Sequence, residues 1–404
     1  MSEFSLATKN AKSTKAEWKT CRLGEVADLN LGKMLDAKKN QGILRPYLNN
    51  VAVRWGQFDL ADLPEMRIED DEVERYQITK GDIVICEGGE PGRCAIWKSD
   101  EPIFFQKALH RARVKSEFDS IFIYYQLCHL VKTGETRNYE TGSTIRHLPA
   151  QELKQIPISL PPLPTQRRIA AVLSSLDDKI ENNRKICANL EAQAQAIFKS
   201  WFVDFEPFGG KMPQGWKMGK LGDVAEITMG QSPDGKSLND VDDGITFFQG
   251  RAEFGNRFPT KRLSTTEPNR MAKAGDVLLS VRAPVGDLNI ALEDCCIGRG
   301  LSAIRSKAGS QSFIYCLLKT LKPAFDLYEG AGTIFGSINK DSLHGLDVVV
   351  PDSGWIEKFE SVVSSHDRMY RERELESRAL AAMRDALLPK LMSGEIDVEK
   401  VKVA

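Results

Sequence analysis

The feature that most constrains the fold of this chain is an internal repeat. Residues 23–27 (LGEVA) are matched by residues 221–225 (LGDVA), at an offset of 198 positions. Residues 80–84 match 274–278 at an offset of 194, and anchors between 142 and 161 match at an offset of 190. Because the anchors keep their order while the offset shrinks smoothly, the chain contains two copies of one unit that differ by small loop deletions.

The composition is that of an ordinary globular protein. The chain has 404 residues, 42% of them hydrophobic, with 55 Lys and Arg against 56 Asp and Glu. This excludes a disordered or collagen-like chain, and the near-zero charge requires any nucleic-acid surface to be local. The N-terminus is polar, no apolar run has the length of a membrane span, and no Cys-x-x-Cys occurs among the eight cysteines. We therefore expect a cytoplasmic protein with reduced thiols.

Each copy is predicted to begin with an α+β globular domain. Short strands entered by a Gly-Asp turn are expected at 83–85 and 277–279, and aromatic-rich, glycine-free helices at 120–131 and 311–321. The predicted organisation has five segments. They are a flexible N-terminal segment 1–17, a globular domain 18–160, a helical region 161–208, a second globular domain 209–350 and a distal helical region 351–404.

A long helix is predicted to follow each domain. After residue 164, apolar positions alternate at spacings of four and three residues, which is the pattern of a heptad seam. The second seam is more polar in its middle. We predict that the two helices pair with each other; the alternative is that each packs on its own domain. The residues predicted to pair are Ile169, Leu173, Leu176, Ile180, Asn183, Leu190, Ile197 and Trp201 in the first helix, and Phe359, Val363, Tyr370, Leu380, Leu387 and Leu391 in the second.

Motifs for catalysis are mostly absent from the sequence. Residues 230–237 (GQSPDGKS) fit the P-loop pattern, but a P-loop requires a helix that begins at the lysine, and the sequence after Ser237 is a poor helix former. The five histidines lack metal-ligand spacing, and no carboxylate-lysine arrangement of a nuclease is found. We predict that the chain is not catalytic by itself and has no metal site. A P-loop NTPase, a self-sufficient nuclease and a scaffold that binds only protein remain alternatives.

Local basic stretches favour nucleic-acid binding. Residues 37–58 and 103–115 contain several Lys and Arg and no acid, and residues 251–270 of the second copy have five basic and two acidic residues. Such stretches, interleaved with amides and aromatics, suit phosphate neutralisation and reading of base edges; the alternative is a solvated mixed-charge surface. The candidate DNA contacts are Lys38, Lys39, Arg45, Asn49, Asn50, Arg54, Arg93, Lys107, Arg111, Ser143, Thr144, Arg146, Lys236, Gln249, Arg251, Arg257, Lys261, Arg262, Arg282, Arg299 and Thr333.

The order of these motifs resembles the specificity (S) subunits of type I restriction–modification systems. The resemblance rests on the LGEVA and LGDVA openings, the Gly-Asp strands, residues 142–145 (GSTI), residues 156–169 (IPISLPPLPTQRRI), residues 201–208 (WFVDFEPF) and residues 227–233 (ITMGQSP). It covers nearly the whole chain past residue 17. The second copy departs from the pattern after Pro351, where residues 352–355 (DSGW) replace the Pro-Leu-Pro-Thr-Gln pattern.

The resemblance implies a function in DNA recognition. The two globular domains would be target recognition domains, each reading half of a split, asymmetric DNA site. The helical regions would pair antiparallel as a coiled coil and dock two methyltransferase (M) subunits, which restriction (R) subunits would join. No cofactor is expected in this chain, because S-adenosylmethionine, ATP and Mg²⁺ would be used by the partner subunits.

Overall fold

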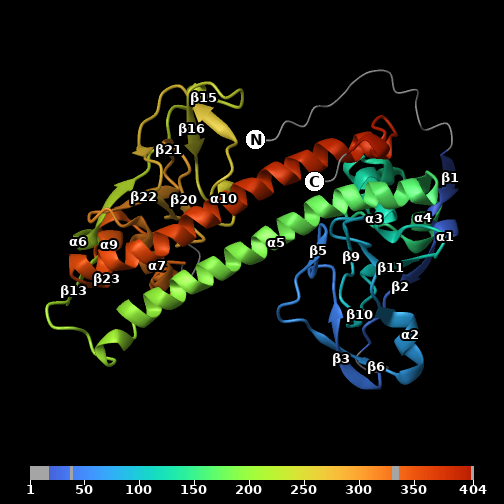
Figure 1. Cartoon of the computed structure of the whole chain (residues 1–404), viewed down its shortest axis with the longest axis horizontal. Helices are drawn as coiled ribbons and strands as arrows, with labels where there is room; N and C mark the ends of the chain where they lie inside the picture. Colours follow the sequence, from blue (N-terminus) through green and yellow to red (C-terminus); the bar gives the residue numbers. More distant parts are fainter. Residues whose placement is uncertain (1–17, 37–39, 330–335, 402–404) are drawn as a thin grey trace. The chain divides into compact units, whose positions relative to one another are not determined.

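The structure is a computed structural model that describes residues 18–36, 40–329 and 336–401. The chain divides into two compact units: unit 1 comprises 1–182 and 376–404, and unit 2 comprises 183–375. The boundary between them falls inside the two long helices α5 (Leu163–Phe202) and α10 (Ser353–Met392). Each unit therefore contains one globular domain and one half of each helix (Figure 1). The predicted flexible segment 1–17 lies outside the described residues.

The globular part of unit 1 is an α+β domain with two four-stranded sheets, ordered β2-β11-β8-β9 and β6-β3-β10-β7, and two-stranded sheets β1-β12 and β4-β5. Its strands are β1 (Lys19–Arg22), β2 (Ala27–Leu31), β3 (Ile43–Leu48), β4 (Val53–Arg54), β5 (Gln57–Phe58), β6 (Glu65–Ile68), β7 (Gln77–Ile78), β8 (Ile83–Cys86), β9 (Cys94–Ile96), β10 (Ile103–Phe105), β11 (Leu109–Val114) and β12 (Pro157–Leu160). Its helices are α1 (Leu23–Val26), α2 (Val73–Tyr76), α3 (Ser120–Thr133) and α4 (Ala150–Gln155).

Unit 2 repeats this plan with sheets ordered β14-β22-β19-β20, β15-β17-β16-β21-β18 and β13-β23. Its strands are β13 (Lys217–Lys220), β14 (Ala225–Met229), β15 (Leu238–Asn239), β16 (Ile245–Phe248), β17 (Leu263–Thr265), β18 (Met271–Ala272), β19 (Val277–Ser280), β20 (Leu288–Ile290), β21 (Cys295–Ile297), β22 (Leu301–Ser306) and β23 (Asp347–Val350). Its helices are α6 (Leu221–Val224), α7 (Gln311–Thr320), α8 (Lys322–Asp326) and α9 (Lys340–His344). The predicted α+β class and internal repeat are confirmed.

The repeated Gly-Asp turn has the same structural role in both units. Gly81 and Gly275 adopt φ values of 89° and 88°, in the left-handed region that favours glycine. The aspartate that follows Gly81 is Asp82, whose carboxylate accepts a hydrogen bond from the backbone N–H of Thr79 at 2.8 Å and pairs with Arg113 of β11 at 2.7 Å. In unit 2, Asp276 and Arg305 of β22 form the equivalent pair, also at 2.7 Å. The motif thus fixes the entry to the central strand of each sheet.

The two long helices run antiparallel to each other within each unit. In unit 1, Arg384 of α10 pairs with Asp177 of α5 at 2.6 Å. In unit 2, the Asn183 side chain contacts the backbone carbonyl of Arg373, and Cys187 Sγ that of Tyr370 at 3.7 Å. The predicted pairing and the alternative both describe part of the structure, because each half-helix packs on its partner helix and on the domain of its unit.

The predicted seam residues differ in burial. Those near the helix ends that pack into a domain core are almost fully buried: Ile169, Leu173, Phe359, Val363 and Leu391 are each no more than 2% exposed. Asn183 and Tyr370 are also buried, whereas Leu176, Ile180, Leu190, Ile197, Trp201, Leu380 and Leu387 are half-buried. The strongest burial along the seam therefore comes from the domain cores near the helix ends and, at Asn183, from the facing helix.

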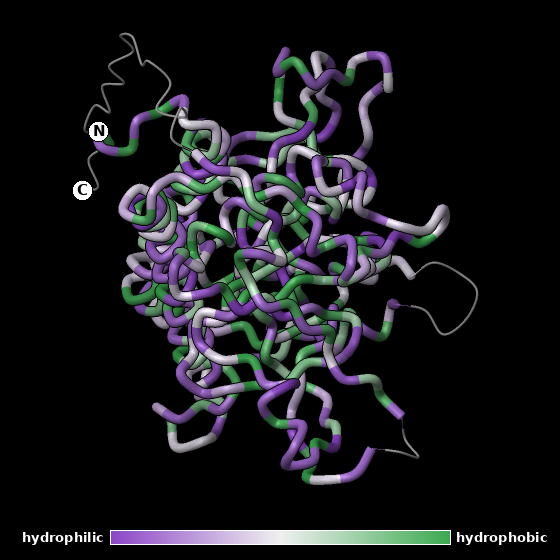
Figure 2. The backbone as a smooth tube through the Cα atoms, turned by 90° about the vertical axis from the view of Figure 1, so that its right-hand side faces the viewer, coloured by the Kyte–Doolittle hydropathy of each residue, from purple (hydrophilic) through white to green (hydrophobic). Residues whose placement is uncertain are grey.

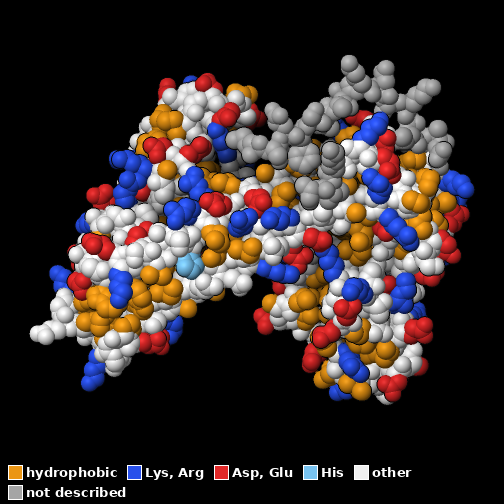
Figure 3. Space-filling model, viewed as in Figure 1, with side chains coloured by type: hydrophobic (Ala, Val, Ile, Leu, Met, Phe, Trp, Pro, Cys, Tyr) orange, Lys and Arg blue, Asp and Glu red, His pale blue; other side chains and the backbone are white. Residues whose placement is uncertain are grey.

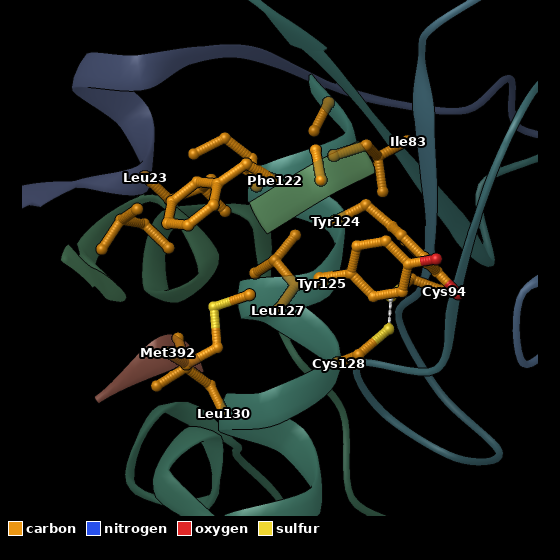
Figure 4. Close-up of a cluster of buried hydrophobic side chains, with 14 of the residues drawn as sticks. Leu23, Ile83, Cys94, Phe122, Tyr124, Tyr125, Leu127, Cys128, Leu130 and Met392 are labelled. Atoms are coloured by element: carbon orange, nitrogen blue, oxygen red, sulfur yellow. Dashed lines mark hydrogen bonds between the residues drawn. The ribbon is translucent and has the colours of Figure 1, made fainter. Parts of the chain in front are cut away.

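The core of unit 1 combines segments from both ends of the chain. Leu23, Phe122, Leu127 and Leu130 meet Met392, which comes from the last turn of α10 (Figure 4). Val398 in the 3₁₀ turn Val398–Lys400 joins the same cluster and is 3% exposed. Hydrophobic and hydrophilic residues alternate along most of the chain, and many of the loops at the rim of the view are hydrophilic (Figure 2). Among the described residues, no helix is long and apolar enough to span a membrane.

Candidate nucleic-acid interface

Five loops meet at one edge of the unit 1 domain, where β2, β3, β8 and β10 end. The backbone N–H of Gly32 donates to the carbonyl of Leu109 at 3.0 Å, and that of Gln106 to Leu48 at 3.1 Å. A bridge between Gly88 and His147 brings in the loops 87–93 and 140–147. We call this set of loops, at 32–36, 49–55, 87–93, 106–108 and 140–147, loop edge 1. The predicted contacts Asn50, Arg93 and Thr144 therefore lie on neighbouring loops.

Unit 2 builds the same edge with the same backbone hydrogen bonds. Gly230 N–H donates to the carbonyl of Leu301 at 2.9 Å, and Gly298 N–H to that of Phe248 at 2.8 Å. A bridge between Arg282 and Ser337 replaces the one between residues 88 and 147. Loop edge 2 thus comprises 230–237, 249–251, 281–287, 298–300 and 336–338. The bonds make position 32 equivalent to 230, 49 to 249, 106 to 298 and 107 to 299.

Polar side chains at loop edge 1 are tied to one another. The Arg93 guanidinium pairs with Glu90 at 2.9 Å and donates to the backbone carbonyl of Asn50 at 2.7 Å. Trp55 Nε1 donates to the same Glu90 carboxylate at 2.8 Å. The predicted residues Arg54, Lys107, Ser143, Thr144 and Arg146 are exposed in these loops, and Asn49 and Asn50 are half-buried. The arrangement presents amides, hydroxyls and cations on one polar surface that suits phosphate and base edges.

Loop edge 2 carries cations with fewer partners. Arg299, Arg282 and Lys236 are exposed, and no carboxylate pairs with them among the described residues. Arg251 pairs with Asp287 on the neighbouring loop. The face of the molecule seen in Figure 3 mixes Lys and Arg with Asp and Glu throughout, so positive charge is local. Lys and Arg side chains without an internal partner remain available to neutralise phosphate.

Two predicted DNA contacts are wrong, because their side chains are buried. Arg111 is 3% exposed and donates to the backbone carbonyls of Glu74 and Gln77, and burial lowers the pKa of its guanidinium. Arg257, also 3% exposed, pairs with Asp367 of α10. Local composition indicates that a stretch is basic but does not show whether a side chain points to solvent or into the core. Composition alone therefore does not separate these two buried arginines from exposed ones.

The other predicted contacts lie away from the loop edges or outside the described residues. Arg45 is exposed on the β3–β6 ribbon. Lys261 pairs with Asp242, and Arg262 pairs with Glu253 at 2.9 Å. Lys38, Lys39 and Thr333 fall outside the described residues. Sequence reasoning does not select Ser232 of loop edge 2 or Asn269, which donates to the Ser232 carbonyl at 3.1 Å. Ser232 lies in the GQSP segment, which fits the P-loop pattern and contributes to the family resemblance without indicating a role for the serine.

The apparent P-loop has the wrong structure for binding a nucleotide. Gly235–Ser237 form one 3₁₀ turn, in which the Asp234 side chain accepts from the backbone N–H of Lys236 at 2.9 Å. Strand β15 follows at once, so no helix presents its N-terminus at the lysine. In the described part of the chain, no group of three or more His, Cys, Asp or Glu side chains is placed to hold a metal ion.

The fold and its paired loop edges define a class of protein: a duplicated binding protein with two related, non-identical recognition surfaces. The model of the type I restriction modification DNA specificity domain matches residues 15–192 and 213–355. The chain belongs to this family. It is a type I restriction–modification specificity subunit with DNA-binding target recognition domains.

Relatives with the same description match along nearly the whole chain. A putative type I restriction enzyme MjaX specificity subunit of Methanocaldococcus jannaschii is 27% identical, over 95% of this chain and 94% of its own length. The type I restriction enzyme HindI specificity subunit of Haemophilus influenzae is 23% identical, over 94% of this chain and 100% of its own length. The crystal structure of a type I restriction–modification S subunit from M. genitalium is similar in fold, with a TM-score of 0.62, 19% identity and coverage of 93% and 96%.

Proposed function

We propose that each loop edge reads one half of a bipartite DNA site. The observation that carries this proposal is the repeated loop edge, built by equivalent backbone hydrogen bonds but lined by different side chains. Position 49 is Asn and its equivalent 249 is Gln, while 107 and 299 are both basic. Because side chains at base edges set sequence preference, two edges with different side chains read different half-sites. The DNA site is then asymmetric.

The helices α5 and α10 set the spacing of the half-sites and dock two methyltransferase subunits in this proposal. Each helix has 40 residues, which corresponds to about 60 Å at about 1.5 Å per residue. Many side chains along both helices are half-buried or exposed outside the domain cores, which leaves surface for partner chains. Restriction subunits join through the methyltransferase subunits.

The chain itself supplies specificity and no catalysis. S-adenosylmethionine, ATP and Mg²⁺ are then used by the partner subunits. The absence of a helix after Lys236 supports this division of labour over the NTPase alternative. Turnover of DNA by the chain without partners would overturn this part of the proposal.

Two exchanges in the complex with the methyltransferase subunit test the proposal. Replacing residues 18–160 by the equivalent domain of another specificity subunit is expected to change one half of the methylated sequence and leave the other half unchanged. Deleting the heptad Ile180–Ile186 is expected to change the spacer or abolish binding, with both half-sites keeping their sequence. Methylome sequencing reads both results. A change in both halves after the domain exchange contradicts the domain assignment, and an unchanged spacer after the deletion contradicts the role of the helices.

A further inference from the structure

One side-chain amide at loop edge 2 is held in a fixed orientation. The Ser232 hydroxyl donates to Oε1 of Gln249 at 3.2 Å and accepts the backbone N–H of Arg299 at 3.3 Å. A serine hydroxyl has a single proton, so a hydroxyl that accepts from a backbone N–H keeps that proton for the amide oxygen. The amide oxygen thereby accepts a hydrogen bond, and Nε2 makes no hydrogen bond among the described residues, which leaves it available as a donor.

The loop around Ser232 is itself anchored. Nδ2 of Asn269 donates to the backbone carbonyl of Ser232 at 3.1 Å. The N–H of Gln231 donates to the carbonyl of Ile297 at 3.0 Å, and Pro233 is buried. A hydroxyl on a fixed loop restricts the amide that it contacts more than a hydroxyl on a free loop would. The Gln249 side chain therefore has little rotamer freedom left to lose when it binds DNA.

Gly298 provides the space in which the Gln249 side chain lies. A Cβ atom at Gly298 would come within 3.1 Å of Cδ of Gln249 and 3.0 Å of its Cα. Contacts this short are tighter than ordinary van der Waals contact, so any larger residue at 298 would displace the amide. Serine at 232 and glycine at 298 together define the position of Gln249.

Unit 1 lacks this arrangement at the equivalent positions. Asn49, the equivalent of Gln249, uses its side-chain oxygen to accept the backbone N–H of Ala52 at 2.9 Å, within its own loop. Met34 stands where unit 2 has Ser232, and Gln106 stands where it has Gly298. At these positions the amide of unit 2 is held by a serine from another loop, whereas that of unit 1 is held by its own loop, so the two loop edges present different hydrogen-bonding groups.

We propose that Gln249 is a specificity-determining residue of unit 2, and that Ser232 is its positioning residue. Nε2 of Gln249 donates a hydrogen bond to an acceptor on a base edge of double-stranded DNA, such as N7 or O6 of guanine, N7 of adenine or O4 of thymine. Arg299, exposed and adjacent to the amide, neutralises a neighbouring phosphate. The inference rests on the proposed function, since it assigns one hydrogen bond within the reading of a half-site.

The test uses the complete complex of this chain with its methyltransferase subunit. The complex is incubated with a randomised double-stranded DNA library, and the bound fraction is sequenced. Gln249→Glu replaces the donor by an acceptor of the same shape. It is expected to move the preference at one position of one half-site toward bases that present an amino group, cytosine or adenine, and to weaken binding to the original site by about 5- to 150-fold. Ser232→Ala is expected to keep the preferred base and reduce discrimination at that position by about threefold.

A matched control separates the added charge from the lost donor. Gln214→Glu adds a carboxylate at an exposed amide outside both loop edges and is expected to leave the bound sequences unchanged. If Gln249→Glu abolishes binding, Ser232→Ala decides: relaxed discrimination at one position supports the inference, and wild-type discrimination overturns it. Gln249→Glu with unaltered preference at every position also overturns it, while the bipartite reading stands. A wild-type complex without sequence preference would instead refute the proposed function.

Discussion

The buried Arg257 gives a prediction in which structural and DNA-binding roles have opposite consequences. Its guanidinium carbon lies 4.3 Å from the ring centroid of Tyr315 and 4.7 Å from that of Tyr370, and the group pairs with Asp367. Burial lowers the pKa of Arg257, but Asp367 and Tyr315 outweigh this effect and raise it above the ordinary value. The side chain thus fastens a loop of the unit 2 domain to α7 and α10.

We predict that Arg257→Met destabilises unit 2 by about 3 kcal/mol. Removing one partner of a buried ion pair costs about 3–5 kcal/mol, and the lower end applies because the Asp367 side chain keeps 25% of its exposure. Two cation–π contacts add about 1 kcal/mol each, which the packing of the methionine against both rings offsets in part. For a unit of this size the melting temperature falls by about 10 °C.

Thermal unfolding and the salt dependence of DNA binding are measured on the same complex. Arg257→Met is expected to lower the melting temperature and leave the salt slope unchanged, because the buried guanidinium contacts no phosphate. The matched control is Arg299→Ala, an exposed cation at loop edge 2, which is expected to keep the stability and reduce the slope of log K against log salt by about 0.9. An Arg257→Met complex with wild-type stability and a reduced salt slope would refute the structural assignment.

Three further predictions concern stability. Glu360 accepts a hydrogen bond from Ser312, and burial raises the pKa of its carboxyl above the ordinary value of 4.5. The contribution of Glu360 to stability is therefore fully present below pH 4.5 and is lost as the pH rises through the raised pKa. Glu360→Gln is expected to remove this pH dependence of the unfolding free energy, as measured by urea titrations at several pH values. Phe198, 1% exposed and 5.1–5.6 Å from three other ring centroids, is expected to cost about 3–5 kcal/mol when replaced by Ala, with protection against hydrogen exchange falling in unit 2 only. Val398→Ala is expected to cost about 2 kcal/mol and to lower protection in unit 1 only; an equal loss in both units would contradict the division of the chain.

The sequence predicted the elements that depend on local pattern. The repeat, the Gly-Asp turns and the long amphipathic helices can be recognised from the spacing and type of residues, because these elements depend mainly on residues that are near in sequence. The polar middle of the second helix was harder to interpret, because its partners are distant in sequence. Arg384 pairs with Asp177, and the carbonyl of Arg373 receives the Asn183 amide. Hydrogen bonds and ion pairs between the two helices thus stabilise polar side chains at seam positions where a heptad pattern predicts apolar ones.

The candidate site was predictable only in outline. Asn49 follows a strand at loop edge 1, and Gln249 and Arg299 follow strands at loop edge 2, so composition and copy position were enough to select them. Their orientation depends on contacts across the fold, such as that of Ser232 with a residue 17 positions away. The burial of Arg111 and Arg257 depends on which carbonyls, carboxylates and rings the fold brings to them. A basic stretch in a sequence therefore does not identify these distant partners.

The discontinuity of unit 1 has a consequence for biosynthesis. Unit 2 is one uninterrupted stretch of chain, residues 183–375, whereas the core of unit 1 requires Leu391, Met392 and Val398 from the end. A growing chain can complete unit 2 while the first domain still exposes the apolar surface that these residues cover. Of the two domains, the one that is synthesised earlier is thus the one whose core is completed later. Both recognition domains exist together only after residue 398 has been made, so a chain that stops before it leaves the apolar core of its earlier domain uncovered.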